Sequence, residues 1–133
     1  MFGKVKLRPT DRLYTKYIRL RYNYTCQNPK CRRIYHRDDC HNLGVSHFYG
    51  RGRENTRFDD DNCLPFCTLP CHYYLQGEGR KEYDALMLER LGNAGCDLLM
   101  LRANTFKRRD DVIDKFIITK KLEGLMIPIG GTK

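Results

Sequence analysis

Two close pairs of cysteines, Cys26 with Cys31 and Cys67 with Cys71, constrain this chain more than any other feature of its sequence. Each pair is next to turn-forming or helix-starting residues. A loop that brings the two pairs together would offer four thiolates in the tetrahedral arrangement that zinc prefers. The gaps of four and three residues are wider than the usual gap of two. We predict a structural zinc site that stabilises a small fold, with ordinary buried thiols as the alternative.

The seven cysteines cannot all form disulfides, because their number is odd. The N-terminal residues lack the apolar core of a secretory signal, and no segment approaches the roughly 20 apolar residues of a membrane span. We therefore expect a cytoplasmic protein without a membrane partner, in which cysteines serve metal binding or chemistry. Cys40, Cys63 and Cys96 are expected to be core or surface thiols, although Cys40 or His41 is an alternative zinc ligand.

The 133 residues suit one domain, residues 1–133, and their charge is unevenly distributed along it. The net charge is +6 over residues 1–25, zero over residues 26–79 and +3 over residues 80–133. All four histidines and six of the seven cysteines fall in the neutral middle. Positive segments on both sides of a centre rich in reactive side chains favour a nucleic-acid partner.

The pattern of apolar residues predicts an α+β fold with helices on both sides of a small sheet. Residues 1–25 contain a basic helix whose apolar positions recur at helical spacing, namely Leu13, Tyr17, Leu20 and Tyr24. Arg19 and Arg21 lie off that stripe, where they either contact DNA or form a solvated face. Residues 43–48 and 63–66 predict two short strands, and a helix is expected to begin near Thr68.

Residues 80–133 are predicted to be mainly helical. One apolar stripe is expected to end at Gly92, which is well placed to stop a helix. A last helix is expected from Asp110 to about Gly124. Its apolar side is predicted to consist of Val112, Ile113, Phe116 and Ile117.

Three polar residues occupy distinctive places in the middle segment. His47 ends the first predicted strand, Asn62 precedes the second, and His72 lies on the helix that follows. The surrounding motifs are Ser46-His47-Phe48-Tyr49-Gly50-Arg51-Gly52-Arg53, Thr56-Arg57-Phe58-Asp59-x-Asp61-Asn62 and Cys67-x3-Cys71-His72-x-Tyr74. Over residues 11–92 the chain resembles HNH endonucleases, in particular phage recombination nucleases of the NinG/Rap type. The resemblance implies a zinc-stabilised ββα-metal core in residues 26–79.

The residue types suit phosphodiester hydrolysis. We expect His47 to remove a proton from water, since a neutral imidazole is a base near pH 7. A divalent ion, Mg²⁺ or Mn²⁺, would neutralise the phosphate. We expect His72 to anchor that ion, with Asp61 and Asn62 as further ligands. The resemblance also gives Asn62 a different role, which is to hold the loop that aims His47.

Three arginines in the loop between the strands can bind phosphate by paired hydrogen bonds: Arg51, Arg53 and Arg57. Arg57 best matches the family pattern. Two positions depart from that pattern. Ser46 stands where an aspartate ligand is common, and Gln76 stands where a second histidine is common.

These expectations lead to a metal-dependent DNA endonuclease with a structural zinc ion. The resemblance implies DNA processing in phage recombination within an infected bacterium, on duplex or branched DNA. A non-catalytic zinc-containing DNA-binding module of the same fold is the alternative, and Ser46 and Gln76 favour it. A RING-type protein-binding module fits the cysteine spacing less well. The sequence is compatible with a homodimer but shows no interface signature.

Overall fold

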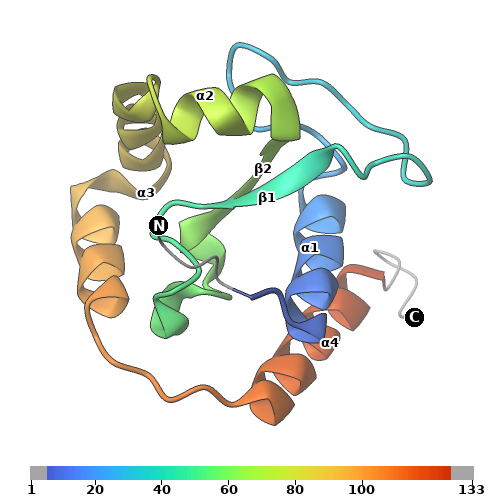
Figure 1. Cartoon of the computed structure of the whole chain (residues 1–133), viewed down its shortest axis with the longest axis vertical. Helices are drawn as coiled ribbons and strands as arrows, with labels where there is room; N and C mark the ends of the chain where they lie inside the picture. The colour runs from blue at the N-terminus through green and yellow to red at the C-terminus, as the bar shows by residue number, and fades with distance from the viewer. Residues whose placement is uncertain (1–5, 127–133) are drawn as a thin grey trace, which may run out of the picture.

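The computed structural model describes residues 6–126 and is a mixed α+β structure. Three short turns accompany the main elements: η1 (Glu54–Thr56) and η2 (Asp60–Asn62) lie between the strands, and η3 (Thr68–His72) connects the second strand to a short helix. The main elements are α1 (Pro9–Arg21), β1 (Leu43–His47), β2 (Cys63–Cys67), α2 (Tyr73–Gln76), α3 (Arg80–Ala103) and α4 (Asp111–Met126). The helices surround the two central strands (Figure 1).

The two strands pair antiparallel, with Leu43 opposite Cys67 and His47 opposite Cys63. Both lie where the sequence predicts them. Pro65 is tolerated inside β2 because each strand of a two-stranded sheet has an edge that needs no partner. The residues of β2 are nevertheless all buried, since other elements cover both faces of the sheet.

Helix α1 begins at a proline, whose missing N–H costs nothing in the first turn. The Asp11 carboxylate accepts a hydrogen bond from the Arg8 N–H at 2.7 Å and so completes this N-terminus. The buried face consists of Tyr14, Tyr17 and Ile18. It is rotated from the predicted stripe, of which Leu13 and Leu20 lie half-buried at the border.

Helix α3 is interrupted at Gly92, whose φ of 73° and ψ of 172° are not helical. Figure 1 shows α3 as two differently directed stretches joined there. The predicted helix end at Gly92 is thus a break, after which helical structure resumes. Tyr83 and Met87 are buried on the first stretch, and Leu99 and Ala103 on the second.

Helix α4 packs against α1, but not by the side that the sequence predicts. Its buried residues are Asp114, Ile118 and Leu122. The predicted apolar side is exposed to solvent, so that expectation is wrong: Val112, Ile113, Phe116 and Ile117. Apolar residues occur on most sides of this helix, and their spacing alone does not identify the side that meets α1. The helix also continues through Gly124 to Met126.

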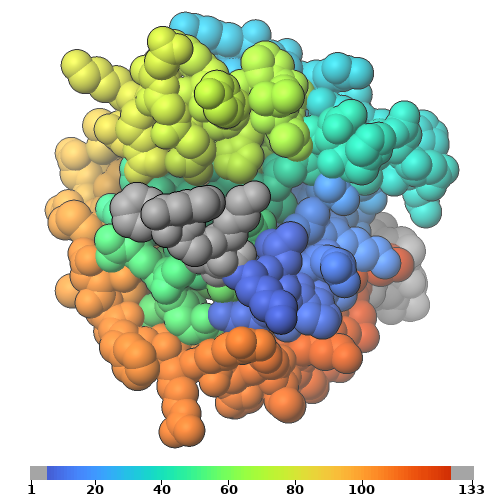
Figure 2. Space-filling view, in the orientation of Figure 1, coloured from blue at the N-terminus to red at the C-terminus, as the bar shows by residue number. Residues whose placement is uncertain are grey.

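The buried apolar residues form two clusters on either side of the strands. Leu64 and Phe66 of β2 pack with Tyr83 and other residues of α3. Val45 and Cys63 pack with residues of α1 and α4. In the space-filling view, the yellow-green segment of η3 and α2 forms one rim of the molecule and the orange α3–α4 connection forms the opposite rim (Figure 2). Within residues 6–126, no helix is both long and apolar enough to cross a membrane.

Candidate functional site

The four predicted cysteine ligands lie together. The sulfur atoms of Cys26, Cys31, Cys67 and Cys71 are all within 4.8 Å of one another. Cys31 Sγ and Cys67 Sγ are 3.7 Å apart. Two thiolates bound to one zinc ion by 2.3 Å bonds at a tetrahedral angle are separated by roughly 3.8 Å. The cluster could therefore hold a metal ion such as zinc.

Separate parts of the chain supply the two cysteine pairs. After α1 the chain turns at Asn23 and Tyr24, which both have positive φ, and this turn brings the first pair against the end of β2. The second pair comes from the last residue of β2 and from η3. Cys40 and His41, the alternative ligands, lie outside the cluster. Cys63 is a buried core thiol, as expected.

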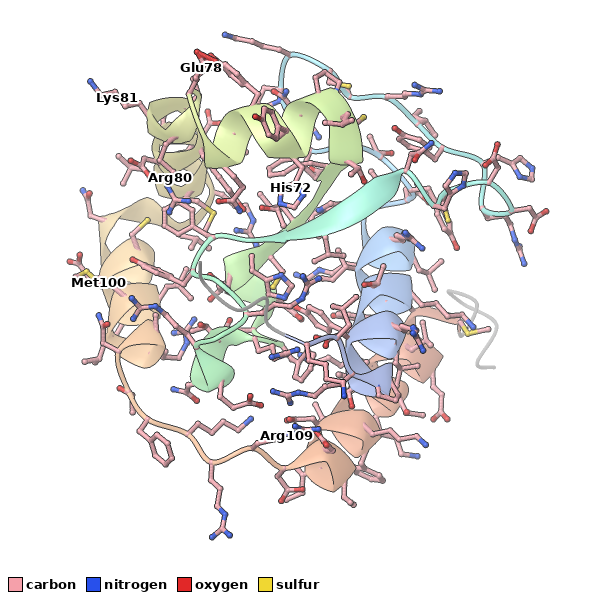
Figure 3. All side chains as sticks on the ribbon, in the orientation of Figure 1. His72, Glu78, Arg80, Lys81, Met100 and Arg109 are labelled. Atoms are coloured by element: carbon pink, nitrogen blue, oxygen red, sulfur yellow. The ribbon has the colours of Figure 1, made fainter. Side chains whose placement is uncertain are left out.

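A cleft of about 410 Å³ lies between the end of β1 and the end of η3, and its lining includes His47, Arg51, His72 and Gln76. Figure 3 shows His72 between α2 and the strands. The antiparallel pairing places the end of β1 beside the start of β2, and the chain then returns along η3 to the same place. The structure thus brings together the two histidines and one of the three predicted loop arginines.

The surroundings of His47 determine which ring nitrogen carries the proton. Its Nε2 lies 2.9 Å from the Arg57 carbonyl oxygen. Since a carbonyl only accepts, we assign the hydrogen to Nε2 and the lone pair to Nδ1. Burial lowers the pKa of His47 to about 4, and the positive charge of Arg51 acts in the same direction. His47 is therefore a neutral imidazole near pH 7, and its lowered pKa makes it a weaker base than an exposed histidine.

Asn62 is fully buried and holds the loop after β1. Its Oδ1 accepts a hydrogen bond from the Tyr49 N–H at 2.8 Å. Its Nδ2 donates to the carbonyl oxygens of Tyr49 at 2.9 Å and Thr56 at 3.0 Å. Of the two roles considered for Asn62, these contacts fit the loop-holding one. An amide oxygen that bonds to Tyr49 is not directed at a metal in the cleft.

Arg51 and His72 give the cleft its electrostatic character. Arg51 Nε is buried, has no hydrogen-bond partner within the described part of the chain, and lies 3.8 Å from Asp11 Oδ1. Burial lowers the pKa of His72, and the charge of Arg51 lowers it further. Among the described residues 6–126, the cleft lining therefore combines one guanidinium with two neutral imidazoles and includes no carboxylate. The positive charge of Arg51 favours an anion in this cleft.

Ser46 and Gln76, the two positions that depart from the family pattern, are hydrogen-bonded to each other. Gln76 Nε2 donates to Ser46 Oγ at 2.8 Å and to the His47 carbonyl at 3.1 Å. Gln76 Oε1 accepts from Arg80 Nη1 at 3.1 Å. Because arginine only donates and a carbonyl only accepts, both neighbours fix this amide orientation. Ser46 is fully buried and also bonds to the Tyr83 hydroxyl at 2.8 Å.

Arg57, the arginine that best matched the family pattern, is not available to bind DNA. Its side chain is only 2% exposed. It forms a paired ion bridge with Asp11, at 3.0 Å and 2.6 Å, and donates to the carbonyl oxygens of Arg51 and Lys6. The predicted phosphate contact is therefore wrong. Arg57 instead ties α1 to the loop that carries Arg51, while its own carbonyl orients His47.

The other predicted DNA contacts lie outside the cleft lining. Arg19 is half-buried and donates from Nε to the Leu43 carbonyl at 2.8 Å. Arg21 pairs with Asp60 at 2.6 Å. Arg53 is exposed, but it donates to Asn104 Oδ1 at 2.6 Å and to the Ala103 carbonyl at 3.2 Å. All three side chains thus make intramolecular contacts.

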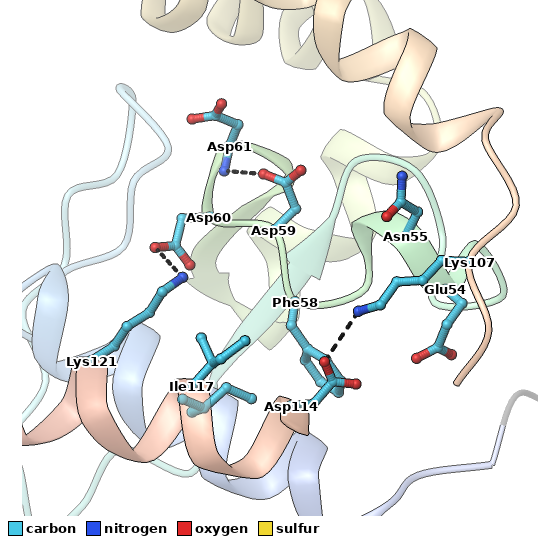
Figure 4. Close-up of a pocket in the computed structure, with 11 residues that line it drawn as sticks. Glu54, Asn55, Phe58, Asp59, Asp60, Asp61, Lys107, Asp114, Ile117 and Lys121 are labelled. Carbon is cyan, nitrogen blue, oxygen red and sulfur yellow. Dashed lines mark hydrogen bonds and ion pairs between the residues drawn. The ribbon is translucent and has the colours of Figure 1, made fainter. Parts of the chain in front are cut away.

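The acidic run from Asp59 to Asp61 lines a different pocket, of about 380 Å³, between the interstrand loop and α4 (Figure 4). Asp59 caps η2 by accepting from the Asp61 N–H at 3.0 Å. Asp61 pairs with Arg102 at 3.1 Å. Asp60 accepts from the hydroxyls of Tyr14 and Tyr17 and pairs with basic residues. The structure therefore does not bring Asp61 and Asn62 together with His72 as a metal site.

Sequence reasoning missed the roles of Arg57 and of the Ser46–Gln76 pair. The spacing of Ser46 and Gln76 relative to the two histidines was the available signal, because each occupies a place where a ligand is common. Comparison of the chain with protein-family models, with curated proteins and with solved structures found no match.

Proposed function

We propose that this protein is an HNH-type endonuclease that hydrolyses phosphodiester bonds in DNA. The observation that carries the proposal is the cleft in which a buried neutral His47, a partly buried Arg51 and His72 face the same space. His47 comes from β1, Arg51 from the loop that follows it and His72 from η3, and this chain order supports the proposal. The assignment to phage recombination rests on the sequence resemblance alone.

In the proposed reaction, His47 Nδ1 accepts a proton from a water molecule whose oxygen attacks phosphorus. The Arg51 guanidinium binds the non-bridging phosphate oxygens and offsets the charge that develops on them. His72 donates a further hydrogen bond to the phosphate. The bond between phosphorus and the leaving oxygen breaks, and that oxygen takes a proton from solvent.

A catalytic Mg²⁺ or Mn²⁺ ion would supply additional positive charge at the phosphate, but the side chains in the cleft do not fit such an ion well. Mg²⁺ prefers oxygen ligands, usually carboxylates. The amide group of Gln76 is held by Ser46 and Arg80, and Ser46 is buried. His72 is then the one conventional ligand among the described residues of the cleft lining. Any dependence of cleavage on a divalent ion should therefore saturate only at millimolar concentrations or above.

We propose that zinc occupies the four-cysteine cluster, because the sulfur spacing matches a tetrahedral thiolate site. Cys71 of the cluster directly precedes His72 of the cleft in η3. A bound ion would hold η3 against β2 and thereby position one side of the cleft.

A nicking assay on supercoiled plasmid tests the proposal, with linear duplex and a four-way junction alongside. Each reaction is run with Mg²⁺, with Mn²⁺ and without added divalent ions, while the zinc content of the protein is monitored. His47→Ala should lower cleavage by at least about 100-fold in whichever condition supports it. The matched control is His41→Ala, since His41 is an exposed loop histidine outside the cleft. Equal cleavage by wild type and His47→Ala would refute the catalytic role.

The hydrogen bond between Ser46 and Gln76 favours a second candidate function, a non-catalytic DNA-binding module. In that case DNA would be retarded in a gel without cleavage in any of the three conditions. Arg51→Ala should weaken DNA binding under either function, because the guanidinium is the cationic group of the cleft.

A further inference from the structure

A second depression adjoins the cleft. It has a volume of about 860 Å³, follows η3 and α2, and shares His72 and Gln76 with the cleft lining. Its side chains include Leu69 and Tyr73, which are 72% and 78% exposed. We call this depression the apolar groove. Large apolar side chains exposed beside a polar cleft indicate a contact surface.

Local structure explains why these two side chains face outward. Leu69 has φ −130° and ψ 136°, an extended conformation inside the otherwise helical η3. Cys71 and Leu75 occupy the inward positions of η3 and α2 and pack in the core. Tyr73 lies between them in sequence, on the opposite side of the helix. Within the described part of the chain, neither Leu69 nor Tyr73 belongs to a buried cluster.

Tyr74 anchors α2, the helix that forms one wall of the groove. The Tyr74 hydroxyl donates to Glu82, and the Tyr74 ring lies against Gly79, where a β-carbon would come within 2.3 Å of it. Tyr73 therefore projects from a supported element. The exposed ring of Tyr73 provides a flat surface on which another ring can stack.

The charge of the groove indicates what would lie there. Glu78 lines it, and Figure 3 shows Glu78 at the end of α2 beyond His72. A negative side chain disfavours a phosphate in the groove, whereas a phosphate is favoured in the cleft by Arg51. A polymer that places a phosphate in the cleft and a neutral flat ring in the groove satisfies the charge preference of the cleft and that of the groove. A nucleotide has that arrangement.

We propose that the apolar groove binds an unpaired base of a DNA strand whose neighbouring phosphate lies in the cleft, and that Tyr73 stacks on this base. Bases within a duplex already stack on their neighbours, and their faces are covered. The groove therefore selects DNA that contains an unpaired nucleotide beside the phosphate to be cleaved. This inference rests on the proposed function, since it assigns a substrate class to the same site.

Fluorescence quenching of 2-aminopurine measures this stacking directly. The base is placed either in a single-nucleotide bulge or within a complete duplex of the same sequence, and the protein carries His47→Ala to prevent cleavage. We expect quenching and at least about fivefold tighter binding for the bulge. Tyr73→Ala should abolish both effects, whereas Tyr73→Phe should retain them. Phe106→Ala is the matched control, because Phe106 is 90% exposed and lies outside the groove lining.

An unchanged preference for the bulge in Tyr73→Ala would overturn the proposal. So would self-association in sedimentation that Tyr73→Ala abolishes, because the groove would then be a contact between copies of this chain. The experiments distinguish failure of the proposed nuclease activity from failure of the proposed base-binding groove. Stacking without any cleavage by the wild-type protein would refute only the nuclease. Cleavage that depends on His47 but responds equally to both substrates, with and without Tyr73, would refute only the base-binding groove.

Discussion

His47 has a partner that fixes its tautomer and surroundings that keep it neutral. The Arg57 carbonyl takes the Nε2 hydrogen, and burial lowers the pKa to about 4. The imidazole that would act as a base is therefore already deprotonated well below neutral pH.

We predict that histidine NMR spectra will show His47 protonated on Nε2 with a titration midpoint near pH 4, against an ordinary value of 6.5. Between pH 6.5 and 4 the unfolded chain binds a proton that native His47 does not bind, so the free energy of unfolding should fall as pH falls across this window. The contribution is about 1–3 kcal/mol. Urea denaturation of wild type and His47→Gln measures it, because other titrating groups act in both. Parallel pH profiles for the two proteins would contradict the assignment.

Arg51 and Arg57 lie in the same loop but have different surroundings. Arg51 lines the cleft, whereas Arg57 pairs with buried Asp11. Arg57→Ala should lower the free energy of unfolding by about 3–5 kcal/mol, because buried Asp11 would lose both close hydrogen bonds to the guanidinium and keep only the 3.8 Å contact with Arg51 as an ion pair. Arg51→Ala should change stability by much less and weaken DNA binding instead. Thermal unfolding and a binding titration of both variants provide the comparison. Similar loss of stability in both would show that Arg51 is also structural.

Among the elements, the two strands could be predicted because short apolar runs bounded by polar loops are local signals. The α-helix expected from near Thr68 begins only at Tyr73, because Leu69 has an extended backbone inside η3. The buried face of α4 could not be predicted. Apolar side chains occur on several sides of this helix, and the choice of Ile118 and Leu122 depends on the position of α1. Contacts between distant segments decide which stripe is buried, and they leave no mark on local spacing.

Gly92 and Gly124 both lie in helices, but only Gly92 has a backbone conformation that favours glycine. Gly92 has φ 73° and ψ 172°, which side-chain-bearing residues rarely adopt, whereas a β-carbon at Gly124 within α4 meets no atom within 4 Å. We predict that Gly92→Ala lowers the free energy of unfolding by about 1–3 kcal/mol. Gly124→Ala should raise it by about 0.5–1 kcal/mol. Chemical denaturation of both variants checks the signs, and destabilisation by Gly124→Ala would argue against a regular helix there.

For the whole molecule, the cysteine cluster connects the segment after α1 to β2 and η3. The chain has 133 residues and a core divided into two clusters, so a metal ion bound at the four cysteines would contribute substantially to stability. The clustering of the four cysteines could be predicted from sequence because cysteines are few and the spacing of the two pairs is distinctive.

We predict that the purified protein contains one zinc ion per chain and that its removal by a chelator causes loss of most of the cooperative thermal transition. Cys26→Ser should lose the ion, while Cys40→Ser should keep it, because Cys40 is outside the cluster. Elemental analysis and circular dichroism measure both effects. Retention of stoichiometric zinc by Cys26→Ser would contradict this ligand set.

The candidate cleft was predictable only in part. The order of His47, Asn62 and His72 indicated which residues to examine, and the structure places both histidines in one cleft. The arginines could not be ranked from sequence, because a guanidinium that binds phosphate and one that pairs with a buried aspartate have the same local pattern. Only the position of Asp11, 46 residues from Arg57 in the chain, distinguishes them.

Cys71 and His72 are adjacent residues of η3, so the metal cluster and the cleft share a piece of backbone. A newly synthesised chain without its ion would lack the anchor that holds this turn against β2. Metal loading would thus act as a maturation step, after which the side chains of the cleft face one another. Under the proposed function, cleavage of DNA would then depend on loading of the cysteine cluster, although the ion itself takes no part in the reaction.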